Sequence, residues 1–194
     1  NDDDILVINT ESKSPTKVLE EKILPLSILT EGHPLLRTPV EDFDMSQIMQ
    51  PEIQKFIKQL KLTMHTYSGV GLSANQCGFK FRMFVIGTDQ FQMACINPKV
   101  IEVAEEIVKE NEGCLSFPAF FLNFSRPKWI EVEYTNENGE RTQVKLDGLT
   151  ARCFLHELDH LNGVKFTSYV GAVAMQQAKR KQEKLIKKIV RRKK

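Results

Sequence analysis

The sequence predicts an α+β fold, with antiparallel β-sheets packed around a buried central helix that carries HELDH and an additional C-terminal helix. Apolar residues recur with helical spacing between residues 51 and 66. Alternating apolar and polar residues flank the turn sequence NENG at residues 136–139, which predicts a β-hairpin. The segment around HELDH has apolar residues on more than one helical face, which indicates a helix buried on several sides.

The composition is that of one compact domain, because 41% of the 194 residues are hydrophobic and 27% are charged. No apolar run approaches the roughly 18 residues of a membrane helix, and the opening NDDDILVINTESKS lacks a signal-peptide layout. We therefore expect a cytoplasmic monomer with no membrane partner, and leave an organellar or virus-encoded origin open. The cysteines form no CxxC pair, so neither a disulfide scaffold nor a zinc knuckle is predicted.

Composition divides the chain into three parts. Residues 1–22 are polar and predict an N-terminal extension, residues 23–170 predict the folded domain, and residues 171–194 predict a basic helix. Residues 179–194 hold ten Lys or Arg and one Glu, which leaves 17 basic and 24 acidic residues, or a net charge of −7, in the remainder. An acidic body thus carries a basic tail.

The first half of the domain should contain a loop, a helix and two strands. Residues 33–44 have two prolines and no sustained period, which is typical of a loop. A helix is expected from about Pro51 to Thr66. The glycine-rich residues 68–78 predict a tight loop, and the apolar runs MFVIG and ACINP predict buried strands separated by a turn near residues 88–90.

Two further helices follow the hairpin. The HELDH helix should begin near Asp147, a suitable N-cap, and end at Asn162-Gly163. The last helix has one apolar side and is otherwise nearly all basic. That side is marked by Met175, Ala178, Leu185, Ile186 and Ile189, with Gln182 among them.

HELDH combines residue types that suit a metal-dependent hydrolase. His156 and His160 are four residues apart, so both imidazoles can reach one ion about 2.0 to 2.1 Å away. Glu157 is placed to act on a water molecule rather than to bind the ion. The alternative is a polar network without metal, which is the reading we prefer for the isolated His33 and His65.

A catalytic ion needs a third protein ligand, and the segment after His160 offers only Glu183 in the basic tail. The third ligand must therefore lie upstream. Cys114, in ENEGCLSFP, follows a glycine that would permit a bend, although a lone cysteine is more often a small buried hydrophobe. GVGLSANQCG, residues 69–78, lacks the spacing of a phosphate or dinucleotide loop, and its Gln76 amide could donate to an oxyanion.

Together these stretches resemble the motif set of the peptide deformylases, GxGLAAxQ, EGCLS and HExxH in this order. Here they stand at residues 69–76, 112–116 and 156–160, within a resemblance that covers roughly residues 23–170. Ser73 and Asn75 depart from the first pattern but are small. The segment AFFLNFSR has no arginine before its last residue, whereas many bacterial members place one earlier.

The resemblance implies a reaction and its residues. A divalent ion, Fe2+ natively or else Zn2+, Ni2+ or Co2+, would be bound by Cys114, His156 and His160. Glu157 would serve as general base, and Gln76 with the Leu115 backbone N–H would stabilise the oxyanion, so that N-formylmethionyl nascent peptides release formate. The residues implied in substrate binding are Gly69, Val70, Gly71, Glu112, Leu149 and Cys153.

Two other functions stay open on the residues alone. HExxH by itself also suits a zinc endopeptidase, which would digest casein without deformylating peptides. A binding module that has lost the reaction would carry no metal. The basic tail is either a solvated helix docked on the domain or a contact to ribosomal RNA.

Overall fold

The computed structural model describes residues 22–88 and 90–193, so the predicted extension, apart from Lys22, lies outside the described residues. The α-helices within them are α1 (Pro51–Thr66), α2 (Gly148–Leu161) and α3 (Ala172–Arg192). The strands are β1 (Gly71–Ser73), β2 (Met83–Gly87), β3 (Gln92–Val103), β4 (Ile107–Cys114), β5 (Phe117–Pro127), β6 (Trp129–Thr135) and β7 (Arg141–Asp147). Short 3-10 turns lie at Pro34–Arg37, Met45–Gln47, Ala74–Cys77 and Phe166–Tyr169.

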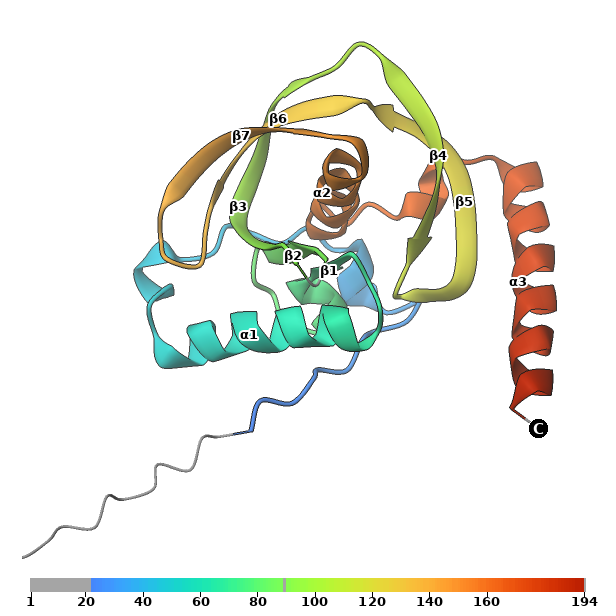
Figure 1. Ribbon diagram of the computed structural model, residues 1–194, viewed down its shortest axis with the longest axis horizontal. Coiled ribbons are helices and arrows are strands. Elements are labelled where there is room, and N and C mark those ends of the chain that lie inside the picture. The colour runs from blue at the N-terminus through green and yellow to red at the C-terminus, as the bar shows by residue number, and fades with distance from the viewer. Residues whose placement is uncertain (1–21, 89, 194) are drawn as a thin grey trace, which may run out of the picture.

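The predicted α+β class is confirmed. One antiparallel sheet has the strand order β1-β2-β3-β6-β7, and a separate two-stranded sheet pairs β4 with β5. In Figure 1 these curved sheets surround α2, while α1 lies along one side of the molecule and α3 lies outside β5. The two sheets therefore enclose the helix that carries HELDH.

Helix α2 is buried because apolar residues occupy several of its faces. Ala151, Phe154 and Leu161 are fully buried and pack with residues of β2, β3 and β6. Asp147 occupies the N-cap position as predicted, although its side chain makes no capping hydrogen bond. Gly163 follows the helix with φ +70°, and a Cβ there would lie 2.8 Å from the Arg37 carbonyl oxygen, so the helix ends where the sequence predicts.

The predictions for α1 and for the hairpin of β6 and β7 are confirmed. The predicted tight loop at residues 68–78 instead contains β1, which pairs with β2 from Gly71 to Ser73. Strand β3 also runs well past the predicted ACINP segment, to Val103. Its pairing with β6 shifts register after Ile96, which lets the strand continue beyond Asn97 and Pro98.

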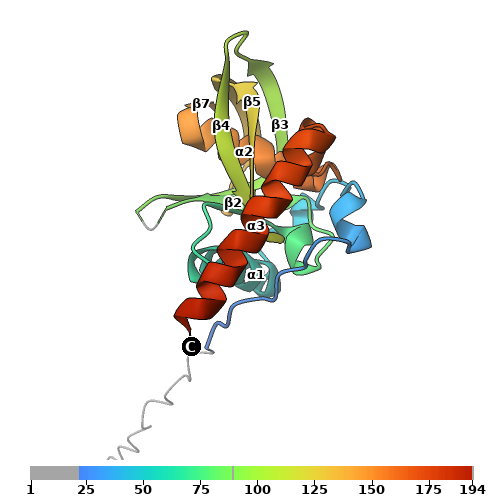
Figure 2. The ribbon, with the colours of Figure 1, turned by 90° about the vertical axis from the view of Figure 1, so that its right-hand side faces the viewer.

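Helix α3 contacts the body mainly through its first half. Ala178 is buried against the phenylalanines of β5, and Gln182 donates a hydrogen bond to the Pro118 carbonyl. Figure 2 shows the helix crossing the β4–β5 hairpin and running on beyond it. Leu185, Ile186, Ile189 and Val190 are exposed, so only part of the predicted apolar side is covered. None of the described helices is long and apolar enough to span a bilayer.

Candidate metal centre and cavity

Two elements bring three candidate ligands together. Cys114 ends β4, and His156 and His160 lie one turn apart on α2. The Cys114 Sγ lies 3.3 Å from the His160 Nε2, and the ligand atoms of all three residues lie within 4.8 Å of one another. An ion about 2.0 to 2.3 Å from each ligand needs donor atoms about 3.4 to 3.6 Å apart, so the cluster is of a size that can hold one.

Glu112 orients the first histidine. Its Oε2 accepts a hydrogen bond from His156 Nδ1 at 2.9 Å, which leaves Nε2 facing Cys114 and His160. Burial raises the pKa of Glu112, but hydrogen bonds from His156 and Arg126 outweigh it and bring the pKa to about 2. Glu112 is therefore a carboxylate that only accepts, and it holds the proton on His156 Nδ1.

The charge distribution around the histidines suits a cation. Burial lowers the pKa of His160 well below its ordinary value, so this imidazole is neutral and able to coordinate. Burial would also lower the pKa of His156, but hydrogen bonds with Cys114 and Glu112 raise it to about 10. The surroundings of His156 thus favour positive charge, which a bound metal ion would supply.

Two buried arginines surround Glu112, and sequence reasoning missed the role of both. Arg126 on β5 binds Glu112 at 2.6 Å and Asp159 at 3.0 Å, while Arg152 on α2 binds Glu112 at 2.8 Å. The sequence held one signal, since Arg152 precedes His156 by four residues on a helix predicted to be buried. A buried arginine requires a carboxylate partner, but the sequence alone does not identify which.

Glu157 projects from α2 into the interior. It is 4% exposed, and its Oε2 has no hydrogen-bond partner among the described residues. Burial raises the pKa of Glu157 to about 7. Its carboxylate also packs against Gly71, where a Cβ would overlap Oε1 and lie 2.9 Å from Cδ. The unpartnered oxygen is thus available to a water molecule or substrate.

The amide of Gln76 is held in one orientation. Its Oε1 accepts hydrogen bonds from the Ser73 N–H and hydroxyl, both at 3.0 Å. Its Nε2 donates to the Ser116 Oγ at 3.1 Å and lies 3.6 Å from the Cys114 Sγ. Nearby, the Asn75 amide donates to the His160 carbonyl at 2.7 Å. The glycine-rich segment therefore places one amide donor beside Cys114 and secures the end of α2 with another.

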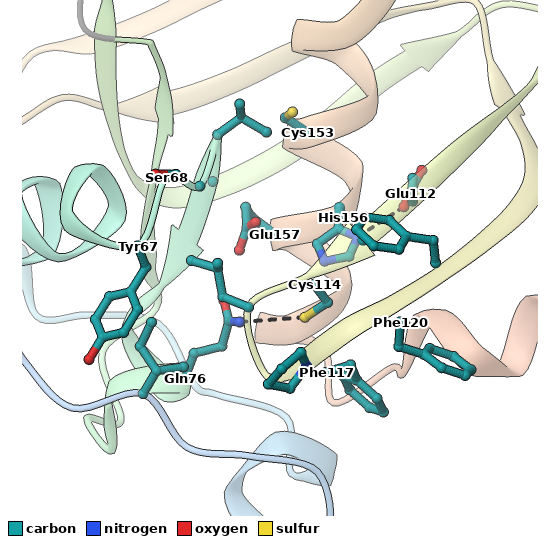
Figure 3. Close-up of a pocket in the computed structure, with 18 of the residues that line it drawn as sticks. Tyr67, Ser68, Gln76, Glu112, Cys114, Phe117, Phe120, Cys153, His156 and Glu157 are labelled. Atoms are coloured by element: carbon teal, nitrogen blue, oxygen red, sulfur yellow. Dashed lines mark hydrogen bonds and ion pairs between the residues drawn. The ribbon is translucent and has the colours of Figure 1, made fainter. Parts of the chain in front are cut away.

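A cavity of about 590 Å³ opens onto these groups. Figure 3 shows Glu157, His156, Cys114 and Gln76 around it, with Phe117 on one side. All six residues that the sequence analysis expected to bind substrate line the cavity, as do Leu115 and Gln76. Tyr67, Phe120 and Phe121 also line the cavity, and no motif or spacing pointed to them.

Gly113 has a different role from the one expected. Its φ is not positive, so it does not provide a left-handed bend. Instead, a Cβ at this position would lie 2.6 Å from the Phe121 ring. Gly113 thus lets an aromatic ring of β5 approach the backbone of β4 closely in the cavity wall.

Residues 25–177 match the family model described as polypeptide deformylase. A peptide deformylase from Thermotoga sp. (strain RQ2) is 43% identical over 136 residues, which cover 69% of this chain and 79% of that protein. One from Prochlorococcus marinus (strain NATL1A) is 37% identical over 176 residues, which cover 85% of this chain and 84% of that protein. The solved structure of a peptide deformylase from Synechococcus elongatus in complex with actinonin has a TM-score of 0.76 at 37% identity, and the match covers 82% of this chain and 86% of that one. The architecture, the ligand cluster and these similarities agree, and the chain belongs to the polypeptide deformylase family.

Proposed function

We propose that the protein removes the N-formyl group from N-formylmethionyl peptides and releases formate, using a divalent ion held by Cys114, His156 and His160. One observation supports this most directly: the three ligand atoms cluster beside Glu157, whose buried carboxylate has an unpartnered oxygen. When bound, the ion would polarise the formyl carbonyl and lower the pKa of water toward about 7. Family analogy favours Fe2+, and the thiolate and imidazole donors also suit Zn2+, Ni2+ or Co2+.

Glu157 moves the proton in this proposal. Its carboxylate accepts a proton from the attacking water as the water oxygen bonds to the formyl carbon. The same carboxyl group then gives that proton to the amine as the carbon–nitrogen bond breaks. The products are formate and a peptide with a free amino terminus. The buried position of Glu157 keeps bulk water from competing for the proton.

Two donors would stabilise the oxyanion that forms on the substrate. The Gln76 Nε2 is held beside Cys114 by the Ser73 and Ser116 contacts, and Leu115, whose backbone N–H would be the second donor, lines the same cavity. A fixed amide needs no reorganisation when charge develops, and one such donor contributes about 10² to 10³ in rate. Both donors are uncharged, so neither competes with the cation.

We further propose that the peptide lies extended beside Gly69 and Gly71, as an added strand next to β1. The methionine side chain would enter the cavity beside Val70, Leu149 and Cys153. Glu112 contributes to the same wall while its carboxylate is held by arginines. Because actinonin is bound in the Synechococcus elongatus structure, we propose that it also binds this cavity.

The wider proposal concerns the setting of the reaction. Residues 23–170 would form the catalytic domain and residues 171–194 a basic helix that contacts ribosomal RNA where nascent chains appear. The enzyme would act co-translationally in the cytoplasm, as a monomer.

The deciding experiment measures formate release from formyl-Met peptides by anaerobically purified protein, with metal analysis of the same sample. We expect turnover that tracks metal content, is lost on chelation and returns when Fe2+ or Co2+ is added. Actinonin should inhibit it. Digestion of casein without deformylation would instead assign the chain an endopeptidase activity, and metal-replete protein that does neither would refute the proposal.

A further inference from the structure

The candidate ligands are divided between two elements that belong to different parts of the fold. Cys114 is on the β4–β5 hairpin, and both histidines are on α2. Among residues 22–88 and 90–193, no backbone hydrogen bond joins α2 to β4 or β5. The hydrogen bonds that join these elements directly are therefore made by side chains.

Two rows of side chains face each other across this junction. On α2 the row is Arg152, His156 and His160, spaced four residues apart, and on β4 it is Glu110, Glu112 and Cys114, spaced two apart. Arg152 contacts Glu110 and Glu112, His156 contacts Glu112, and His160 contacts Cys114. Four helical residues rise about 6 Å and two strand residues about 6.7 Å. The spacing of the side chains along the two rows is therefore nearly the same, and each helical residue lies opposite a strand residue.

Arg152 supplies the first contact of this series and reaches both strands of the hairpin. Its Nη1 donates to the Glu112 Oε1 at 2.8 Å and to the Phe124 carbonyl on β5 at 3.3 Å. Its Nη2 donates to the Val108 carbonyl on β4 at 2.5 Å. The residue is 4% exposed. Its planar group has donors in a fixed arrangement that a lysine ammonium cannot reproduce.

We infer that Arg152 is a positioning residue, which fixes the register between α2 and β4 so that Cys114 meets His156 and His160 at one ion. The inference rests on the proposed metal site and adds to it a residue that is not one of the three ligands, although it lines the same cavity. Loss of Arg152 should leave all three ligands present but poorly aligned. Changes in residues that hold ligands in place usually weaken metal binding or activity about 10- to 100-fold.

The test uses the full chain loaded anaerobically with Co2+, comparing wild type with R152M, R152Q and R152K. R141M is the matched control, because Arg141 also pairs with a carboxylate and a backbone carbonyl but lies on β7, away from the cluster. Two quantities are measured: the rate of Co2+ release to excess EDTA, and the near-ultraviolet thiolate-to-cobalt absorption, which reports the Cys114–metal bond. Circular dichroism checks folding, and R152Q replaces R152M if R152M does not fold.

We expect R152M to release Co2+ about 10- to 100-fold faster than wild type, with a weaker thiolate-to-cobalt band. R152K, which can pair with Glu112 but cannot reach both carbonyls at once, should fall between R152M and wild type. R141M should change neither quantity. Release by R152M or R152Q at the wild-type rate would overturn the inference, and so would full recovery in R152K, since charge alone would then suffice. A wild-type protein without the thiolate band would overturn the proposed metal site itself, and this inference with it.

Discussion

Glu157 is the side chain on which the proposed chemistry depends most. A buried carboxylate with an unpartnered oxygen lowers stability, so its retention in a packed interior needs a reason other than folding. Glu157→Gln keeps the shape and removes the proton acceptor. We expect kcat/KM for formyl-Met peptides to fall about 10²- to 10⁴-fold, with metal content and denaturation midpoint no lower than wild type. Full activity in this variant would contradict the role of Glu157 as base.

Gly71 limits where the Glu157 carboxylate can lie. A methyl group at Gly71 would overlap that carboxylate, whereas one at Gly69 would meet the Leu115 side chain at 2.7 Å. The leucine end can rotate aside without moving a catalytic group, whereas a methyl group at Gly71 would displace the Glu157 carboxylate itself. We expect Gly71→Ala to lower kcat about 10²-fold, because a displacement of about 1 Å at a catalytic group has effects of that size.

Gly69→Ala is the matched control for this substitution and should lower kcat much less. Steady-state kinetics on both variants, with metal content determined, measures the difference. Equal losses of kcat in the two variants would contradict this explanation. They would show that a side chain at either position impairs the segment, whether or not it contacts Glu157.

Among the elements, β3 contains one residue with a left-handed backbone conformation, at the point where its pairing with β6 shifts register. Asn97 has φ +49°, and its side chain accepts from the Phe43 N–H at 2.7 Å and donates to the Phe43 carbonyl at 2.9 Å. The residue therefore both allows the irregularity in β3 and ties the loop before α1 to the sheet. Asn97→Ala should lower the free energy of unfolding by about 2 to 4 kcal/mol, from two lost hydrogen bonds and the left-handed backbone.

Asn97→Gly separates the two causes, because glycine loses the hydrogen bonds but adopts this φ freely. We expect it to be less destabilised than the alanine variant by about 1 to 2 kcal/mol. Urea unfolding of both proteins at equal metal content measures this, and two variants of equal stability would contradict the assignment of strain to Asn97.

The elements that the sequence predicted correctly are those with a strong period. Helix α1 and the β6–β7 hairpin have regular apolar patterns, and Gly163 marks the end of α2. Strand β1 has only three residues, too few for any period. The continuation of β3 beyond Asn97-Pro98 depends on a side-chain bond to a loop more than fifty residues away, which local sequence does not encode.

The candidate site was predictable as a set of residues but not as an arrangement. Motif order identified Cys114, His156, His160 and Glu157, because their types and spacing are specific. No local pattern pairs Glu112 with Arg126 and Arg152, since these contacts join three elements through the folded structure. Arg126 on β5 is an example. It follows an apolar segment, so the sequence predicts that its side chain is exposed to solvent, but the side chain is buried.

At the level of the whole molecule, charge is separated along the chain. Residues 179–194 are strongly basic, and the remainder has a net charge of −7. In the second half of α3, exposed Leu185, Ile186 and Ile189 accompany basic residues that are also exposed. An acidic body is repelled by nucleic acid, so binding to a polyanion should be confined to this helix.

This arrangement predicts how ribosome binding responds to charge and salt. Replacing Lys187, Lys188 and Arg191 by glutamine should weaken binding at low salt and lower the slope of log K against log salt by up to about 0.7 to 0.9 per phosphate contact removed. Deformylation of a free tripeptide should be unchanged, since none of these three residues lines the cavity. The control replaces Lys58, Lys80 and Lys99, which are exposed on the body and change the net charge equally. If both variants bind ribosomes equally well, the net charge of the protein rather than α3 governs the association. If the wild-type protein does not bind ribosomes at low salt, the basic helix is only a solvated surface of the fold.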